Sequence, residues 1–85
     1  MKLDARTASL IAVGASVTAN CQTCLEINVA RAARHGAGPP EIADAVEIGR
    51  KVRAGAAAKL DSSAAGRGVA APAARPDEAA CGCSS

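Results

Sequence analysis

Two cysteines, Cys21 and Cys24, lie three residues apart in the segment Asn20–Asn28. Residues with this spacing share one face of a helix, so if Asn20 caps a helix here, both sulfur atoms lie beside its first turn. The backbone N–H groups of a first turn have no partner within the helix, and with the helix dipole they stabilise a thiolate relative to a thiol. A Cys-x-x-Cys pair at this position is typical of thiol redox chemistry.

The same pair could instead form half of a metal site. Zinc needs a second pair of ligands at matching geometry, and the other cysteines of the chain are Cys81 and Cys83. Four thiolates would suit Zn(II), Cu(I) or arsenite if the end of the chain folds back. Soft-metal or metalloid binding is therefore the alternative hypothesis. A third is a structural oligomer in which the cysteines only fill space.

Composition restricts the compartment and the partners. The Cys-x-x-Cys and Cys-x-Cys spacings are too tight to join distant loops, which favours a reducing cytoplasm over a secreted disulfide scaffold. A net charge of +2 and the absence of aromatic residues give no basis for nucleic-acid binding. No apolar stretch approaches the roughly 20 residues of a membrane span. A signal peptide is the weaker interpretation of the N-terminus, because Asp4 falls in what should be a basic leader.

Three helices are expected to position the cysteine pair. Apolar residues at helical spacing predict a first helix over residues 4–18, with Asp4 as its N-cap, and a second over residues 22–35. The run Gly38-Pro39-Pro40-Glu41 predicts the start of a third helix, which we expect to end near Lys59. The fold class is therefore all-α, with a helical hairpin core.

The composition changes at Asp61, where Ser, Ala, Gly and Pro become dominant and helical periodicity stops. We expect a helical domain over residues 1–60 and a flexible tail over residues 61–85 that ends in Cys81-Gly82-Cys83. A flexible chain of this length can bring the tail dithiol to the helix pair. We therefore interpret the tail dithiol as an accessory redox pair or a set of metal ligands.

The core of so short a chain should be thin. Aromatic residues are absent, and burial within the protomer must come from a few bulky aliphatic residues and many alanines. In the second helix Leu25 and Val29 share a face, while Ile27 projects elsewhere. We therefore expect additional burial between copies, in a homo-oligomer whose protomer is unstable alone.

The chain resembles the carboxymuconolactone decarboxylase and AhpD-like alkylhydroperoxidase family, in its short single-domain form. The resemblance covers about Leu3 to Asp61 and is carried by LIAVGASVTANCQTCLEINVARAARHGAG and PPEIADAVEIGRKVRAGAAAKLD. Family members are all-helical, with the Cys-x-x-Cys at the start of a helix that packs antiparallel to another. They assemble as trimers or hexamers, and the resemblance implies such an assembly here.

The resemblance also implies roles for individual residues. AhpD-like members activate the second cysteine through a His four residues after it and a Glu twelve residues before the first cysteine. These relay positions are Asn28 and Ser9 in this chain, so both relay groups are substituted. By resemblance Cys21 is the resolving thiol and Cys24 the peroxidatic one. The position at the helix end instead favours attack by Cys21, which we expect to be closer to the unpaired N–H groups and more exposed.

The expected function is therefore a thiol–disulfide oxidoreductase that retains weakened AhpD-like peroxidase chemistry. A thiol or dithiol would donate electrons, a peroxide or disulfide would accept them, and no cofactor is expected. The decarboxylase branch of the family works on a lactone without this dithiol. The intact Cys-x-x-Cys argues against that branch here.

Overall fold

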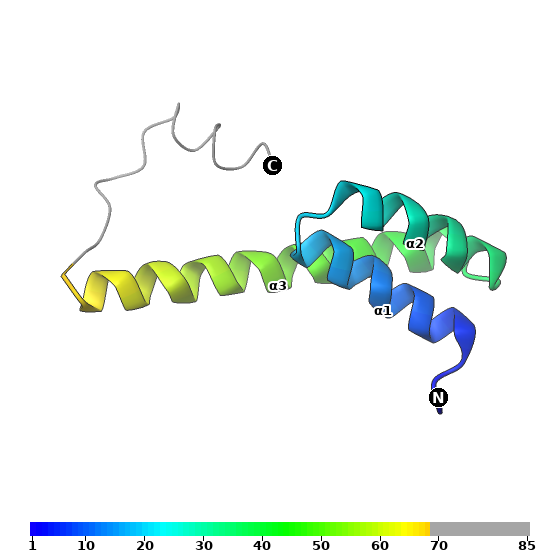
Figure 1. The fold of residues 1–85 in the computed structure, drawn as a ribbon, viewed down its shortest axis with the longest axis horizontal. Helices are drawn as coiled ribbons and strands as arrows, with labels where there is room; N and C mark the ends of the chain where they lie inside the picture. Colours follow the sequence, from blue (N-terminus) through cyan, green and yellow to red (C-terminus); the bar gives the residue numbers. More distant parts are fainter. Residues whose placement is uncertain (69–85) are drawn as a thin grey trace. The chain divides into compact units, whose positions relative to one another are not determined.

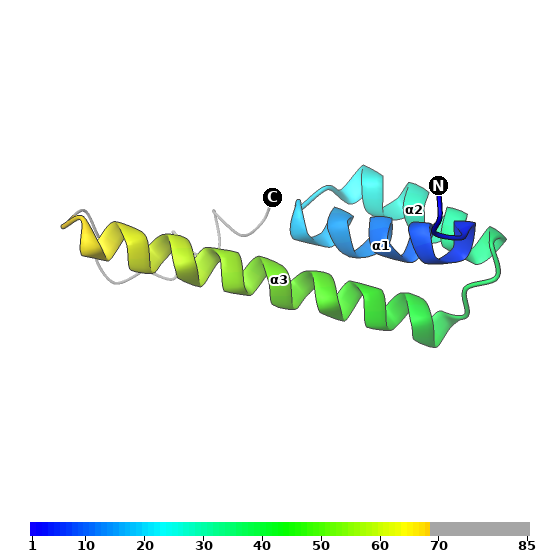
Figure 2. The same ribbon diagram turned by 90° about the horizontal axis from the view of Figure 1, so that it is seen from below.

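The computed structural model describes residues 1–68, which form the helices α1 (Ala5–Thr18), α2 (Gln22–Arg34) and α3 (Pro39–Gly66) (Figure 1). No strand occurs in this part of the chain. Helices α1 and α2 lie side by side and antiparallel, and Figure 2 shows the same pairing from below. The predicted all-α class with a helical hairpin is thus confirmed. Cys81 and Cys83 of the predicted tail lie outside the described residues.

The start of α1 agrees with the prediction. Asp4 has extended backbone angles, and its carboxylate accepts a hydrogen bond from the backbone N–H of Thr7 at 2.7 Å. This bond satisfies one of the donors that a first helical turn leaves unpaired. Val13 and Val17, four residues apart on one face of α1, are buried, whereas Ile11 is exposed.

The turn between α1 and α2 differs from the prediction at Asn20, which is not the N-cap of α2. Asn20 adopts a left-handed backbone conformation with φ of 57°, which asparagine tolerates better than most residues. Its side-chain oxygen accepts a hydrogen bond of 2.7 Å from the Arg53 guanidinium, which also donates to the Val17 carbonyl at 3.2 Å. The tight turn therefore moves the cap one residue along the chain, to Cys21.

The core is as thin as composition predicts. Val13 is the largest fully buried side chain of the described residues, and its buried neighbours are all alanines. Around this cluster pack the partly buried aliphatic residues Leu10, Leu25, Val29, Ile42 and Val46. The small side chains let the helices approach closely, but they leave little apolar area to bury.

Helices α1 and α3 touch at a pair of glycines, Gly14 and Gly49. A Cβ atom added to Gly49 would lie 2.9 Å from Cβ of Val17 and even closer to the Gly14 carbonyl oxygen. The Thr18 hydroxyl spans the same crossing, at 3.0 Å from the Gly49 carbonyl and 3.1 Å from the Gly14 carbonyl. The absence of two side chains is therefore what permits this contact.

Helix α3 begins at the predicted prolines but continues to Gly66, beyond the predicted end near Lys59. The residues from Asp61 to Gly66 are helical because the end of α3 is rich in alanine, the best helix former, and contains no proline. The compact unit that contains α1 and α2 ends at Gly55, and a separate unit begins at Ala56. Within residues 1–68 no helix is both long and apolar enough to cross a bilayer.

Acid should destabilise the packed helices through Glu41. Its carboxylate accepts a hydrogen bond from the Gly38 N–H at 3.1 Å and forms an ion pair with Arg6, and these contacts lower the pKa of Glu41 below its ordinary value of 4.5. Because the folded-state pKa is the lower one, this contribution to stability is fully present above pH 4.5 and is lost as the pH falls through the folded-state pKa.

We therefore expect the Tm of the wild type to fall on acidification through this range, and the Tm of the Glu41→Gln variant to fall less. Thermal melts followed by circular dichroism measure the Tm of both proteins from about pH 7 to about pH 3, a range that spans the ordinary carboxylate pKa. Equal acid dependence of the two proteins would show that Glu41 makes no such contribution.

Candidate functional site

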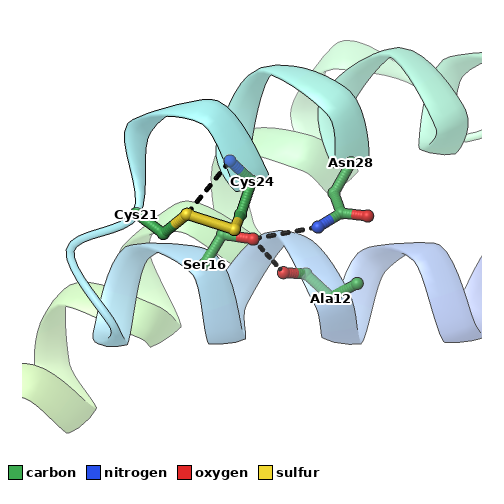
Figure 3. Close-up of a disulfide and its surroundings, with 5 residues drawn as sticks. All are labelled: Ala12, Ser16, Cys21, Cys24 and Asn28. Atoms are coloured by element: carbon green, nitrogen blue, oxygen red, sulfur yellow. Dashed lines mark hydrogen bonds between the residues drawn. A yellow bond between two sulfur atoms is a disulfide. The ribbon is translucent and has the colours of Figure 1, made fainter.

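The first turn of α2 is capped by a sulfur atom. Cys21 has extended backbone angles, and its Sγ accepts a hydrogen bond from the backbone N–H of Cys24 at 3.2 Å (Figure 3). Its carbonyl accepts the first helical bond, from the N–H of Leu25 at 3.0 Å. The sulfur therefore occupies the place that a Ser or Asp oxygen takes in most helix caps. The predicted location of the pair at a helix N-terminus is confirmed, with Cys21 itself as the cap.

Cys21 and Cys24 form a disulfide, with their Cα atoms 5.2 Å apart. This separation lies within the usual range of about 4.4–6.8 Å for disulfides. The structure thus brings together the two sulfur atoms that the spacing placed on one face. The pair is able to close without rearrangement of the helix.

The two cysteines differ in exposure, in the opposite sense to the prediction. Cys24 is exposed, whereas Cys21 is half-buried. The backbone N–H of Cys21 donates to the Ser16 carbonyl at 3.0 Å. This hydrogen bond holds Cys21 against the end of α1 and limits its exposure. An external reagent therefore reaches Cys24 more easily, while the backbone N–H contact belongs to the sulfur of Cys21.

Asn28, at the first relay position, lies one turn beyond Cys24 and contacts α1. Its amide Nδ2 donates to the Ser16 hydroxyl at 3.0 Å, and that hydroxyl donates to the Ala12 carbonyl at 2.7 Å (Figure 3). Sequence reasoning missed Ser16. The available signal was a polar residue on the buried face of α1, close to Val13 and Val17.

Ser9, at the second relay position, is buried and donates its hydroxyl hydrogen to the Ala5 carbonyl at 2.7 Å. Within residues 1–68 no hydrogen bond joins Ser9 to Asn28. A serine and an asparagine can donate and accept hydrogen bonds, but neither takes up a proton near neutral pH. The relay positions therefore supply no general base to the dithiol.

The sequence profile of the carboxymuconolactone decarboxylase family matches residues 1–67. The chain belongs to this family. It is also similar to "Uncharacterized protein 4 in cox locus" of Paracoccus denitrificans, with 42% identity over 55 residues. The match covers 65% of this chain and 50% of the relative, so the chain spans about half the length of that curated relative. No solved structure matches.

Membership of the carboxymuconolactone decarboxylase family confirms the resemblance found in the sequence. Of the predicted site residues, the structure brings Cys21 and Cys24 together. In the described residues no cluster of three or more His, Cys, Asp and Glu side chains could hold a metal ion. The four-thiolate site of the alternative hypothesis also requires Cys81 and Cys83, which lie outside these residues. His35 follows the last turn of α2 as its C-cap.

Proposed function

We propose that this chain is a thiol–disulfide oxidoreductase with its redox centre at Cys21 and Cys24. One observation carries the proposal: the Cys24 N–H donates to Sγ of Cys21 at the N-cap of α2, next to an exposed Cys24. A thiolate at Cys21 would keep this hydrogen bond and gain the favourable end of the helix dipole. Both contacts favour Cys21 as the sulfur that carries negative charge.

Reduction begins with the attack of an external thiolate on the exposed Sγ of Cys24. A new disulfide forms between the donor and Cys24, the Cys21–Cys24 bond breaks, and its electron pair leaves on Cys21 as a thiolate. Thiol–disulfide exchange is faster when the leaving thiolate is more stable, which is the case for a sulfur at a helix cap. A second donor thiolate then attacks the donor sulfur, and Cys24 leaves and takes up a proton. The donor leaves as a disulfide and both protein thiols are reduced.

Peroxide reduction would run the pair in the opposite direction. A Cys24 thiolate attacks the peroxide O–O bond and becomes a sulfenic acid while an alcohol leaves, and the Cys21 thiolate then displaces hydroxide to restore the disulfide. These roles match the ones implied by the family resemblance. With Asn28 and Ser9 at the relay positions, no general base deprotonates the Cys24 thiol, so we propose weak peroxidase turnover in addition to the exchange activity.

The proposed partners follow from this chemistry. The electron donor is a thiol or dithiol, the acceptor is a peroxide or a disulfide, and no cofactor takes part. Because a Cys-x-x-Cys of this kind cycles only where thiols are regenerated, we propose a reducing cytoplasmic setting. Homo-oligomerisation is also proposed, since the described core has one fully buried bulky side chain.

Cysteine variants test the redox centre. In a background with Cys81→Ser and Cys83→Ser, which removes the other thiols, we expect Cys21→Ser and Cys24→Ser each to lower catalysed exchange by at least about 100-fold, since neither sulfur completes the cycle alone. The Cys21→Ser variant should accumulate a mixed disulfide on Cys24, because its resolving thiol is gone. Exchange is followed with a chromophoric aromatic disulfide, and the trapped adduct by mass spectrometry.

Two results would contradict the proposed function. One is unchanged exchange in the Cys21→Ser/Cys24→Ser double variant. The other is stoichiometric zinc or copper in the wild type purified under reducing conditions, which would support metal binding instead.

A further inference from the structure

We infer that Arg53, on α3, is a positioning residue for the redox pair, because it holds the turn that places Cys21 at the N-cap of α2. The inference rests on the proposed function and concerns the equilibrium between the Cys21–Cys24 disulfide and its reduced form. The Arg53 guanidinium Nη1 donates to the Asn20 side-chain oxygen at 2.7 Å and to the Val17 carbonyl at 3.2 Å. The turn lies alongside α3 (Figure 2), so a residue 33 positions after Asn20 reaches it.

The turn ends α1 with a Schellman motif whose last residue is Cys21. The N–H of Asn20 donates to the Val17 carbonyl at 3.1 Å, and the N–H of Cys21 donates to the Ser16 carbonyl at 3.0 Å. This pair of backbone hydrogen bonds, around one left-handed residue, defines the motif. Cys21 is thus both the last residue of the motif and the N-cap of α2. Its position at the cap depends on the motif staying closed.

The left-handed residue of this motif is Asn20, where glycine is most common. Its φ of 57° is unfavourable for a residue with a side chain, whereas glycine adopts such angles freely. Asn20 is also exposed, so burial does not hold it in place. The half-buried Arg53 donates a hydrogen bond from a charged group to its side chain, and such bonds are stronger than neutral ones. This contact therefore offsets the cost of the left-handed conformation.

The turn stabilises the reduced pair more than the disulfide. In the disulfide a covalent bond holds Cys21 beside Cys24. After reduction, the hydrogen bonds of the turn are what hold the Cys21 sulfur where it accepts the Cys24 N–H. A contact that is stronger in one of two states shifts the equilibrium toward that state. Arg53 therefore favours the reduced pair and makes Cys21 a better leaving group in exchange.

The central measurement is the equilibrium constant for reduction of the pair by dithiothreitol. In the Cys81→Ser/Cys83→Ser background, where one pair reacts, we expect Arg53→Gln to lower this constant by about 3- to 10-fold, the effect of one hydrogen bond. Alkylation of free thiols followed by mass spectrometry gives the reduced fraction. Arg50→Gln is the charge-matched control, because Arg50 is exposed on the same helix and pairs with Glu47. It should leave the constant within a factor of about two, since exposed ion pairs contribute little.

Variants of Asn20 separate the turn from the charge of Arg53. Asn20→Gly suits the left-handed angles without a side-chain contact, so in this background Arg53→Gln should change the constant by less than about two-fold. Asn20→Ala removes the acceptor and disfavours the left-handed conformation, so it should lower the constant as Arg53→Gln does. Combining Asn20→Ala with Arg53→Gln should have little further effect, because both act on one contact.

A further control separates the turn from the packing of α3. Thr18→Val removes the hydroxyl that bonds to the Gly49 carbonyl at 3.0 Å, a contact that also joins α1 to α3. We expect this variant to lower the Tm, as Arg53→Gln does. It should leave the reduction constant within a factor of about two, because the lost bond includes neither Asn20 nor Cys21. Circular dichroism melts measure the Tm, and the reduction constants are measured well below it.

Three results would overturn the inference. They are an Arg53→Gln constant within a factor of about two of the wild type, an equal loss in the Asn20→Gly background, and an equal loss in Thr18→Val. If Arg53→Gln does not fold, the exposed Asn20 decides, and equal constants for Asn20→Ala and Asn20→Gly overturn the inference. The reduction constant of a disulfide exists whether or not the protein catalyses exchange. A failure here is therefore distinct from a failure of the proposed function, which the cysteine variants test.

Discussion

Gly49→Ala is expected to destabilise the protein by about 3 kcal/mol or more, enough to remove much of the stability of so small a domain. The new Cβ would lie 2.9 Å from Cβ of Val17 and closer still to the Gly14 carbonyl oxygen. That oxygen belongs to the backbone of α1, so relief requires a shift of the whole helix. The shift would also break the Thr18 hydrogen bond to the Gly49 carbonyl.

Two other glycines supply a graded control for this substitution. A Cβ at Gly14 would lie 3.1 Å from the Ala45 carbonyl oxygen, a milder conflict, whereas a Cβ at Gly55 would meet nothing within 4 Å. Urea unfolding should therefore rank the variants as Gly49→Ala least stable, Gly14→Ala intermediate and Gly55→Ala most stable. Gly55→Ala should exceed the wild type by about 0.5–1 kcal/mol, because alanine is the better helix former. Equal stability of the Gly49→Ala and Gly55→Ala variants would refute the close crossing.

Restoring the relay is expected to raise the peroxidase rate by about 100-fold, which is the lower end of what a positioned general base contributes. Asn28→His places an imidazole one turn beyond Cys24, and Ser9→Glu supplies a carboxylate to orient it. We expect Asn28→His alone to give part of the gain, since a base is present but not oriented. Initial rates of hydroperoxide consumption with a dithiol donor measure the effect.

The single Ser9→Glu variant is the informative control. Ser9 is buried, so a lone glutamate there loses its hydration without gaining a cationic partner. We expect this variant to be less stable than the wild type and no faster, and the double variant to recover stability through a His–Glu contact. A folded double variant with no gain in rate would show that this chain lacks the relay geometry as well as the relay residues.

Local signals in the sequence predicted most of the helical framework. Asp4 and the prolines at residues 39 and 40 determine helix starts through their own backbone chemistry, and the three-residue spacing brought Cys21 and Cys24 together. Asn20 was misassigned because asparagine suits both an N-cap and a left-handed turn, and only the path of the chain decides between them.

The features that the sequence did not reveal depend on contacts between helices. Ser16 matters because α2 packs where the Asn28 amide reaches it; its place beside Val13 and Val17 marks a polar residue on the buried face of α1, but the pattern within α1 does not identify its partner. The Gly14–Gly49 crossing likewise joins residues of two helices that are distant in the chain. The end of α3 was placed too early because a change in composition was interpreted as a loss of structure, although alanine favours helix.

The sulfur cap of α2 joins two equilibria that are usually considered separately, helix fraying and disulfide reduction. The Cys24 N–H that bonds to Sγ of Cys21 in the first turn is the donor that the proposed function assigns to a Cys21 thiolate. Under that proposal the thiolate gains more from this N–H than the disulfide sulfur does, so contacts that keep the first turn wound ease reduction, and the negative charge in turn resists unwinding. A residue far from the sulfur atoms can therefore tune the reduction potential without touching them, merely by changing how often the end of α2 opens.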